Sequence, residues 1–238
     1  MKIIRGIYSG YAAIVFIILF ILFMPFLLIP IAFPSLFNLA GIINRIWAKI
    51  FFTLIFMPLH IEYREALSTK KQYVLCPNHF SYLDIPIVGA GKINAVFVGK
   101  SDMEKIPLFG YMYKKLHITV DRSSLKSKYS TYIRSLEAID HGKSLVIFPE
   151  GGILSTNPPQ LARFKDGAFR VAIEKQIPVV PVIIPDNWII LPESLLLRWR
   201  KPRIIFLEPI ETKGMSLNDL GTLKEKVFKI MQNELLTD

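Results

Sequence analysis

The stretch Cys76-Pro77-Asn78-His79-Phe80-Ser81-Tyr82-Leu83-Asp84 begins at the end of a short apolar run. Its last three residues open a helical pattern over Tyr82 to Ala90. Residues i and i+5 lie about 140° apart on a regular helix. His79 and Asp84 therefore meet only if His79 lies in a strand-to-helix loop and Asp84 in the first helical turn. An aspartate bonded to one ring nitrogen fixes the histidine tautomer and leaves the other nitrogen free to take a proton. The stretch thus predicts a general base and its orienting carboxylate.

Short apolar runs alternate with helical patterns from Tyr73 onward, which is typical of a layered α/β domain. We expect strands near Tyr73–Cys76, Ala95–Val98, Ile118–Val120, Leu145–Phe148, Val179–Ile184 and Ile204–Leu207. Helices are expected at Ser127–Ile139 and Leu161–Lys175, and at the apolar repeat from Leu217 to Met231, for which Ser216 and Asp219 form a capping box.

A nucleophile does not accompany the pair. The chain has no Gly-x-Ser-x-Gly elbow, and Ser81 and Cys76 are the nearest candidates. Ser81 is better interpreted as the cap of a helix beginning at Tyr82, and Cys76 as a small buried strand residue. The base is therefore expected to act on a substrate hydroxyl.

Asn78-His79 through Asp84 resembles the first motif of the lysophosphatidic acid acyltransferases and other glycerolipid acyltransferases. Three further blocks occur in that family's order. They are Lys100 through Ile106-Pro107-Leu108-Phe109-Gly110 to Ile118-Thr119-Val120-Asp121-Arg122, then Phe148-Pro149-Glu150-Gly151, and then Ile177-Pro178-Val179-Val180-Pro181-Val182. Together the blocks span roughly Lys71 to Pro185, with Phe164-Lys165-Asp166-Gly167 also in the family's style.

The resemblance implies a mixed sheet flanked by helices. It also implies acyl transfer from an acyl-coenzyme A or acyl-carrier-protein thioester to 1-acylglycerol 3-phosphate, with phosphatidic acid as product. His79 and Asp84 would be catalytic, and the substrate would contact Asn78, Arg122, Glu150, Gly151 and Lys165. Arg122 and Lys165 suit a phosphate, since one supplies a planar fork and the other a compact charge. A thiolate leaves readily, so neither metal nor cofactor is expected.

The third motif departs from the family pattern, which most often continues Glu-Gly with Thr, Arg and Ser. Ile153 stands at the position of the usual arginine, and His117 where the second motif often has glycine. Arg122, Lys165, Arg163 or Arg170 would have to compensate, or the acceptor is another lyso-lipid, such as a lysophospholipid or an amino-acid lyso-lipid.

The N-terminal region carries no charge from Ile7 to Phe37, while Lys2 and Arg5 precede this run. The run exceeds a signal-peptide core of about 7–15 residues and lacks a small-x-small cleavage site. A spanning helix and a re-entrant or interfacial one both remain open, because Pro25, Pro30 and Pro34 are expected to break or kink a span.

The next segment, residues 42–57, has an apolar face opposite Arg45 and Lys49, which is typical of a helix lying in a bilayer interface. We therefore expect membrane-anchoring helices over residues 1–59 and an α/β domain over residues 60–238. Any acyl-chain pocket is expected to be built partly from the N-terminal helices.

Charge also favours a lipid surface. The 238-residue chain has a formal net charge of +10, of which residues 1–59 contribute +4 from four basic and no acidic residues, leaving +6 for the rest. This excess attracts anionic headgroups, phosphorylated substrates and acidic acyl donors. Nucleic acid is the competing partner, but no binding motif accompanies the charge.

The remaining alternatives concern the function of the protein and the location of its catalytic domain. A lipase-like hydrolase lacks its nucleophile elbow here, and a non-catalytic lipid-binding membrane protein would not need the His79 and Asp84 pair. A single cysteine excludes an internal disulfide, and His60, His117 and His141 are scattered without a zinc pattern, so we interpret them as structural. Because thioester donors are cytosolic, the catalytic domain is expected on the cytoplasmic face of a membrane.

Overall fold

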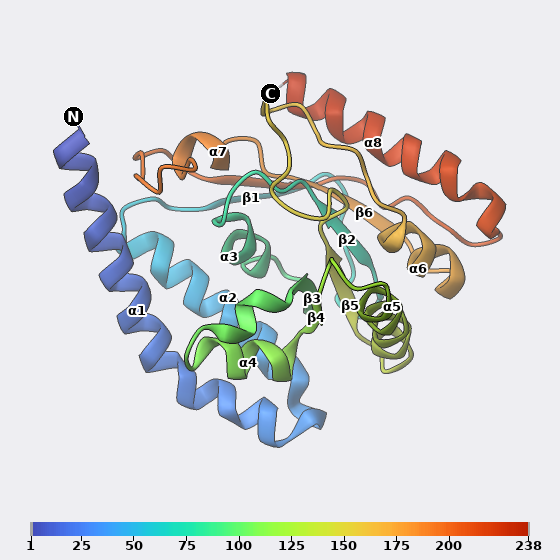
Figure 1. Ribbon diagram of the computed structural model, residues 1–238, viewed down its shortest axis with the longest axis horizontal. Helices are drawn as coiled ribbons and strands as arrows, with labels where there is room; N and C mark the ends of the chain where they lie inside the picture. The colour runs from blue at the N-terminus through green and yellow to red at the C-terminus, as the bar shows by residue number, and fades with distance from the viewer. Residues whose placement is uncertain (1, 238) are drawn as a thin grey trace.

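A mixed β-sheet runs through the computed structural model, which describes residues 2–237 (Figure 1). In this part of the chain the sheet has seven strands in the order β1-β7-β6-β2-β5-β3-β4. They are β1 His60–Tyr63, β2 Val74–Pro77, β3 Ala95–Lys100, β4 Ile118–Val120, β5 Ser144–Ile147, β6 Val179–Ile183 and β7 Arg203–Phe206. The neighbours β6 and β7 are antiparallel, and the other pairs are parallel. The strands from β6 to β4 therefore end at one common edge.

Each of the six expected strands overlaps an observed one, and the mixed sheet is confirmed. The strand β1 was not expected, because its short sequence His-Ile-Glu-Tyr lacks a continuous apolar run. It lies at the edge of the sheet, where β7 is its neighbour. An edge strand has one pairing partner and needs little apolar surface, so its sequence signal is weak.

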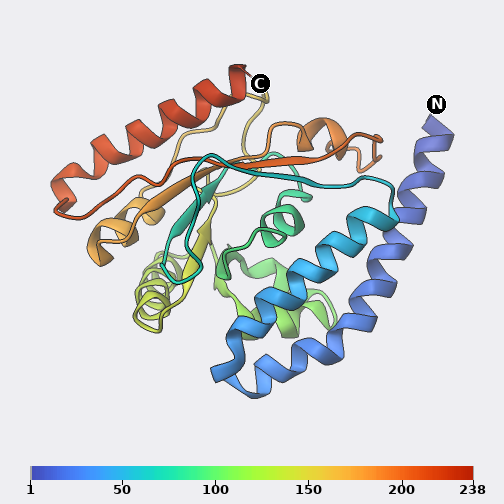
Figure 2. The same ribbon diagram turned by 180° about the vertical axis from the view of Figure 1, so that it is seen from behind.

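Helices cover both faces of the sheet (Figures 1 and 2). They are α1 Lys2–Ala32, α2 Phe37–Leu54, α3 Asp84–Gly89, α4 Phe109–Leu116, α5 Leu125–Asp140, α6 Gly167–Lys175, α7 Asn187–Ile190 and α8 Leu220–Thr237, with 3-10 turns η1 Pro34–Leu36, η2 Ser101–Lys105 and η3 Leu217–Asp219. Strand β2 shows the layering, because Leu75 packs with α1, α2 and α3 while Val74 and Cys76 pack with α6 and α8. The period of two along a strand divides these side chains between two cores.

The helix expected at Leu161–Lys175 begins later, at Gly167. The backbone before Gly167 bonds distant side chains, because the N–H of Leu161 donates to Gln232 and that of Ala162 donates to Glu150. A backbone whose N–H groups bond distant side chains cannot use them for helical bonds. The capping box of Ser216 and Asp219 is confirmed and opens η3 just before α8.

Helix α1 continues through Pro25 and Pro30, so a break at these two prolines is wrong, whereas the helix does end at Ala32, just before Pro34. Of the helices in the described residues, α1 is the one long and apolar enough to cross a membrane, with a mean hydropathy of 3.2 over an 18-residue stretch. Many of its large apolar side chains face outward, including Ile7, Ile14 and Ile18. Such a face suits a lipid environment.

Helix α2 packs back against α1 and also holds the α/β unit (Figure 2). Arg45 was expected on an outward polar face. Instead its guanidinium donates to the carbonyls of Gly91 and Lys92 at 2.9 and 2.8 Å and to the Asn94 side chain at 2.9 Å. These carbonyls follow the C-terminus of α3, where a cation is favoured. Arg45 therefore ties the N-terminal helices to the loop after α3. The expected boundary at residues 59 and 60 stays a prediction.

Candidate active site

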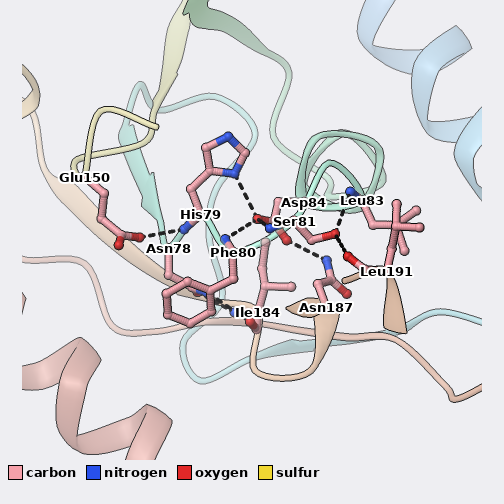
Figure 3. Close-up of polar contacts among 10 residues, drawn as sticks. All are labelled: Asn78, His79, Phe80, Ser81, Leu83, Asp84, Glu150, Ile184, Asn187 and Leu191. Atoms are coloured by element: carbon pink, nitrogen blue, oxygen red, sulfur yellow. Dashed lines mark hydrogen bonds and ion pairs between the residues drawn. The ribbon is translucent and has the colours of Figure 1, made fainter. Parts of the chain in front are cut away.

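His79 and Asp84 lie together at the C-terminal edge of the parallel strands, just beyond β2 (Figure 3). The imidazole Nδ1 is 2.9 Å from Asp84 Oδ2. Because a carboxylate accepts, this bond places the proton on Nδ1 and leaves Nε2 as an acceptor. Among the described residues no protein group bonds Nε2, and the His79 side chain keeps 11% exposure. The expected contact is thus present, and the side chain that carries the basic nitrogen is partly exposed.

Asp84 is completely buried and is held by hydrogen bonds from three directions. The backbone N–H groups of Phe80 and Ser81 donate to Oδ2 at 2.8 and 2.9 Å, and Asn187 Nδ2 donates to Oδ1 at 2.7 Å. Helix α3 begins at Asp84 with Leu83 as its N-cap, so the helix start expected at Tyr82 is wrong. The Ser81 hydroxyl nevertheless accepts the Leu83 N–H at 3.3 Å and donates to the carbonyl of Leu191. The loop is therefore wrapped around the carboxylate, which cannot rotate away from His79.

Glu150 follows β5 and supports the same loop from the opposite side (Figure 3). The backbone N–H of His79 donates to Oε1 at 2.7 Å, and that of Ala162 donates to Oε2 at 2.8 Å. The carboxyl group is fully buried. Burial raises the pKa of Glu150 from its ordinary 4.5 to about 7, although both N–H donors oppose this effect. Both oxygens face protein backbone, an arrangement that favours a positioning role for Glu150.

Asn78 is also buried, and its side chain joins β2 to the end of β6. Its amide donates to the carbonyl of Ile184 at 3.0 Å and accepts from the Ile184 N–H at 2.7 Å. The His79 ring stacks on Phe148, with ring centroids 4.1 Å apart. Packing and hydrogen bonds thus restrict both the backbone and the ring of His79. The substrate contacts expected of Asn78 and Glu150 stay predictions.

Two positively charged side chains lie over successive glycines of the third motif. Gly151 and Gly152 have φ values of 80° and 154°, which a side chain rarely adopts. A Cβ on Gly152 would lie 2.8 Å from Arg122 Nη1, and one on Gly151 would lie 3.3 Å from Lys165 Cγ. Burial lowers the pKa of Arg122. The fold therefore brings Arg122 and Lys165 to Gly151 and Gly152. These two glycines come directly after Glu150, which bonds the His79 loop.

The other candidate compensating arginines, Arg163 and Arg170, are exposed. Arg170 lies over the Tyr132 ring, with its guanidinium carbon 5.1 Å from the centroid. Cys76 is buried in the core, and burial raises the pKa of its thiol. This agrees with its interpretation as a packed strand residue rather than a nucleophile.

An apolar cavity of about 530 Å³ lies beside the site, among α1, α2, α3, α4 and the segment after α7. Tyr82 and Leu83 of the first motif line it, next to Trp47 and Phe51 of α2. His117, where glycine is usual, also lines it and packs against Phe97 and Tyr113. Burial lowers the pKa of His117 to about 4, so it is neutral at pH 7. The N-terminal helices thus do form part of an apolar pocket, as expected.

Two residues of the site were not anticipated. Asn187 stands three residues after Ile184, in a segment that shows no periodicity, and reaches Asp84 across 103 positions of sequence. Phe148 was quoted as part of the third motif but without its stacking role. A polar residue just beyond a fully buried strand at the site edge was the one available signal for Asn187.

Comparison with known proteins gives one consistent family. The family model described as Acyltransferase matches residues 58–185. A 1-acyl-sn-glycerol-3-phosphate acyltransferase of Saccharomyces cerevisiae is 29% identical over 170 residues, covering 70% of this chain and 56% of the yeast protein. A chloroplastic 1-acyl-sn-glycerol-3-phosphate acyltransferase of Arabidopsis thaliana is 30% identical over 215 residues, covering 87% of this chain and 59% of that protein. The chain thus matches less than two thirds of the length of either relative.

Among solved structures, the crystal structure of the 1-acyl-sn-glycerophosphate acyltransferase PlsC from Thermotoga maritima has the same fold. Its TM-score is 0.77 at 20% sequence identity, and the match covers 98% of this chain and 97% of that one. The likeness therefore includes the N-terminal helices as well as the sheet. With the family model matching more than half of its length, the chain belongs to the Acyltransferase family.

Proposed function

We propose that this protein transfers a fatty acyl group from acyl-coenzyme A or acyl-carrier protein to the free hydroxyl of 1-acylglycerol 3-phosphate, forming phosphatidic acid for phospholipid biosynthesis. The observation that carries the proposal is the juxtaposition of three features. They are a histidine oriented by Asp84, two glycines that Arg122 and Lys165 approach just beyond Glu150, and an apolar cavity that Tyr82 and Leu83 connect to the His79 loop. The named relatives act on the same acceptor.

In this mechanism His79 Nε2 removes the proton of the acceptor hydroxyl as its oxygen attacks the thioester carbonyl. Asp84 orients the ring and stabilises the imidazolium that forms. The new ester C–O bond forms and the C–S bond breaks, and the departing thiolate takes the proton from His79. The backbone N–H groups of residues 79–81 are committed to Glu150 and Asp84, so the developing oxyanion needs donors other than these three.

Arg122 and Lys165 are our candidates for binding the acceptor phosphate. They come from different segments but meet at Gly151 and Gly152, where the absence of side chains lets a ligand approach the backbone. Arg122 lies beside the glycine that precedes Ile153, so its guanidinium can serve at the place where the family's usual arginine is missing. A half-buried guanidinium binds a phosphate more strongly than a fully exposed one.

The apolar cavity is our candidate site for an acyl chain. Its lining comes mostly from aromatic and aliphatic side chains, and Tyr82 and Leu83 connect it directly to the His79 loop. Because α1 and α2 form one wall, an acyl chain would enter from the side that carries the apolar N-terminal helix. We propose that the catalytic domain faces the cytoplasm, where thioester donors are available.

The altered third motif favours one second candidate. Ile153 removes a positive charge that a phosphate would use, so a lysophospholipid or an amino-acid lyso-lipid is the alternative acceptor. The reaction and the role of His79 would be the same. What differs is whether activity needs the terminal phosphate.

Thiol release from purified protein tests both candidates. A panel of acyl-coenzyme A and acyl-carrier-protein donors would be assayed with 1-acylglycerol 3-phosphate and with phosphate-free lyso-lipids. We expect release that requires the phosphate-bearing acceptor and is lost in His79→Ala. Release only with other acceptors would select the second candidate. Lipid binding without thiol release from any pair, unchanged by His79→Ala, would show a lipid-binding protein instead.

A further inference from the structure

The loop between α7 and β7 is attached to the N-terminal part of α1 (Figures 1 and 2). We name residues 193–203, which are part of this loop and the first residue of β7, the basic loop. The Leu197 N–H donates to Ser9 Oγ of α1 at 2.8 Å. Trp199 Nε1 donates to the carbonyl of Phe56, just beyond α2, at 2.7 Å. The basic loop is therefore held next to both N-terminal helices, although it is distant from them in sequence.

Three large apolar side chains point outward at this junction. Leu195, Trp199 and Phe56 are 55%, 64% and 67% exposed. Leu195 and Phe56 also have φ values of 55° and 59°, in the left-handed region that such residues seldom occupy. The exposure of these three apolar side chains is unfavourable in water, so this tip is better suited to contact with an apolar phase.

Positive charge surrounds the apolar tip. The basic loop holds Arg198, Arg200, Lys201 and Arg203 against one acidic residue, Glu193, so its net charge is 4 − 1 = +3. Asp186, which precedes the loop, lies 3.1 Å from Arg200 and 4.0 Å from Arg203. On α1, the other element of this junction, Lys2 and Arg5 lie within two helical turns before Ser9. The positive charge at the junction thus exceeds the negative charge of the groups that face it.

We propose that the basic loop is a second membrane-docking element, which inserts Trp199, Leu195 and Phe56 at the bilayer interface and binds anionic phospholipid headgroups through Arg198, Arg200 and Lys201. Tryptophan with arginine and lysine is the composition favoured at that depth. The inference does not depend on which acceptor the enzyme uses. Lipid is the expected partner because the apolar tip adjoins the apolar helix α1. An acidic carrier protein would bind the positive charges and would not need the exposed apolar side chains.

Docking would also place the cavity against the lipid. Leu195 and Leu197 of the basic loop line the apolar cavity, and Leu191, just before it, accepts a hydrogen bond from Ser81 of the first motif. The same short segment therefore separates the cavity from the surface and contacts the His79 loop. A bilayer at the tip of the basic loop would lie one side-chain layer from the proposed acyl site.

A spin label at Ser194→Cys tests the depth of the loop. Ser194 is exposed and the single native cysteine, Cys76, is buried, so labelling is selective. The full-length protein would be placed in bilayer discs containing phosphatidylcholine alone or mixed with phosphatidylglycerol. Collision with oxygen and with a water-soluble nickel chelate reports depth. A label at Glu225→Cys, exposed on α8, is the matched control.

We expect the label at residue 194 to be reached by oxygen and protected from nickel in discs with phosphatidylglycerol, and the label at residue 225 to remain accessible to nickel. Combining Arg198→Gln, Arg200→Gln and Lys201→Gln should weaken loop docking by about 100-fold, at roughly fivefold for each cation. The control triple Lys126→Gln, Lys128→Gln and Lys226→Gln removes the same charge from α5 and α8 and should have no effect.

Nickel access at residue 194 equal to that at residue 225 would overturn the proposal. Protection that is the same without phosphatidylglycerol and survives the triple substitution would overturn the assignment of an anionic headgroup. Loss of access to both reagents, or protection that appears only when acyl-carrier protein is added, would identify a protein partner instead. None of these outcomes depends on acyl transfer, so failure here is distinct from failure of the proposed enzyme activity.

Discussion

Glu150 offers a sharp test of the supporting structure around His79. Its fully buried carboxyl group accepts the N–H groups of His79 and Ala162, and burial raises its pKa from 4.5 to about 7. The folded state therefore binds more protons than the unfolded state between these pH values. The free energy of unfolding must fall as pH rises through this window and then level off.

The magnitude follows from the two pKa values. Each pH unit corresponds to about 1.4 kcal/mol, so the window from 4.5 to about 7 is equivalent to about 3 kcal/mol. Glu150→Gln cannot titrate and keeps one carbonyl acceptor for the two N–H donors. For a chain of this size, about 3 kcal/mol changes the unfolding midpoint by roughly 6–12 °C. The midpoint of the wild type should therefore fall by this amount relative to Glu150→Gln between pH 4.5 and pH 7.5.

Thermal unfolding of the two proteins in the same detergent, followed at half-unit pH steps, measures this difference. Glu193→Gln is the control, because Glu193 is exposed and removal of its charge should leave the pH profile parallel to that of the wild type. Parallel profiles for the wild type and Glu150→Gln would refute the reasoning, since they would mean that Glu150 is ionised equally in the folded and unfolded states.

The other predictions concern turnover and substrate preference. Asp84→Asn should lower kcat by about 10³- to 10⁴-fold with KM little changed, because the amide favours the wrong histidine tautomer; steady-state kinetics with a retained unfolding midpoint check this. Asn187→Ala should lower kcat by about 10- to 100-fold through loss of the bond to Asp84 Oδ1, and an unchanged kcat would contradict that role. Arg122→Gln should raise KM for the phosphate-bearing acceptor by about 10- to 100-fold and leave KM for the donor unchanged. Gly89 lines the apolar cavity and has open space at its Cβ position, so Gly89→Leu should reduce kcat/KM for long acyl donors by about tenfold relative to shorter ones, while Gly221→Leu, outside the cavity, should not.

Local sequence determined much of the site. His79 and Asp84 are five residues apart, so a single loop and helix start bring them together, and the mixture of proline, asparagine and apolar residues indicates that junction. The strands are short apolar runs whose side chains are buried in two cores, and burial of a whole run leaves a continuous apolar signal. The uncharged N-terminal run likewise predicts a lipid-facing helix from composition alone.

Only the tertiary structure decided what holds those residues in place. The partners of the His79 loop, Glu150 and Asn187, lie 71 and 103 positions from the groups they bond, and no local pattern specifies such pairs. The same holds for Arg45, whose charge suggested an outward face until the carbonyls of Gly91 and Lys92 were found opposite it. Local periodicity reports which face of an element is apolar. It does not report which distant backbone group will need a hydrogen-bond partner once water is excluded, and that requirement is met by the fold as a whole.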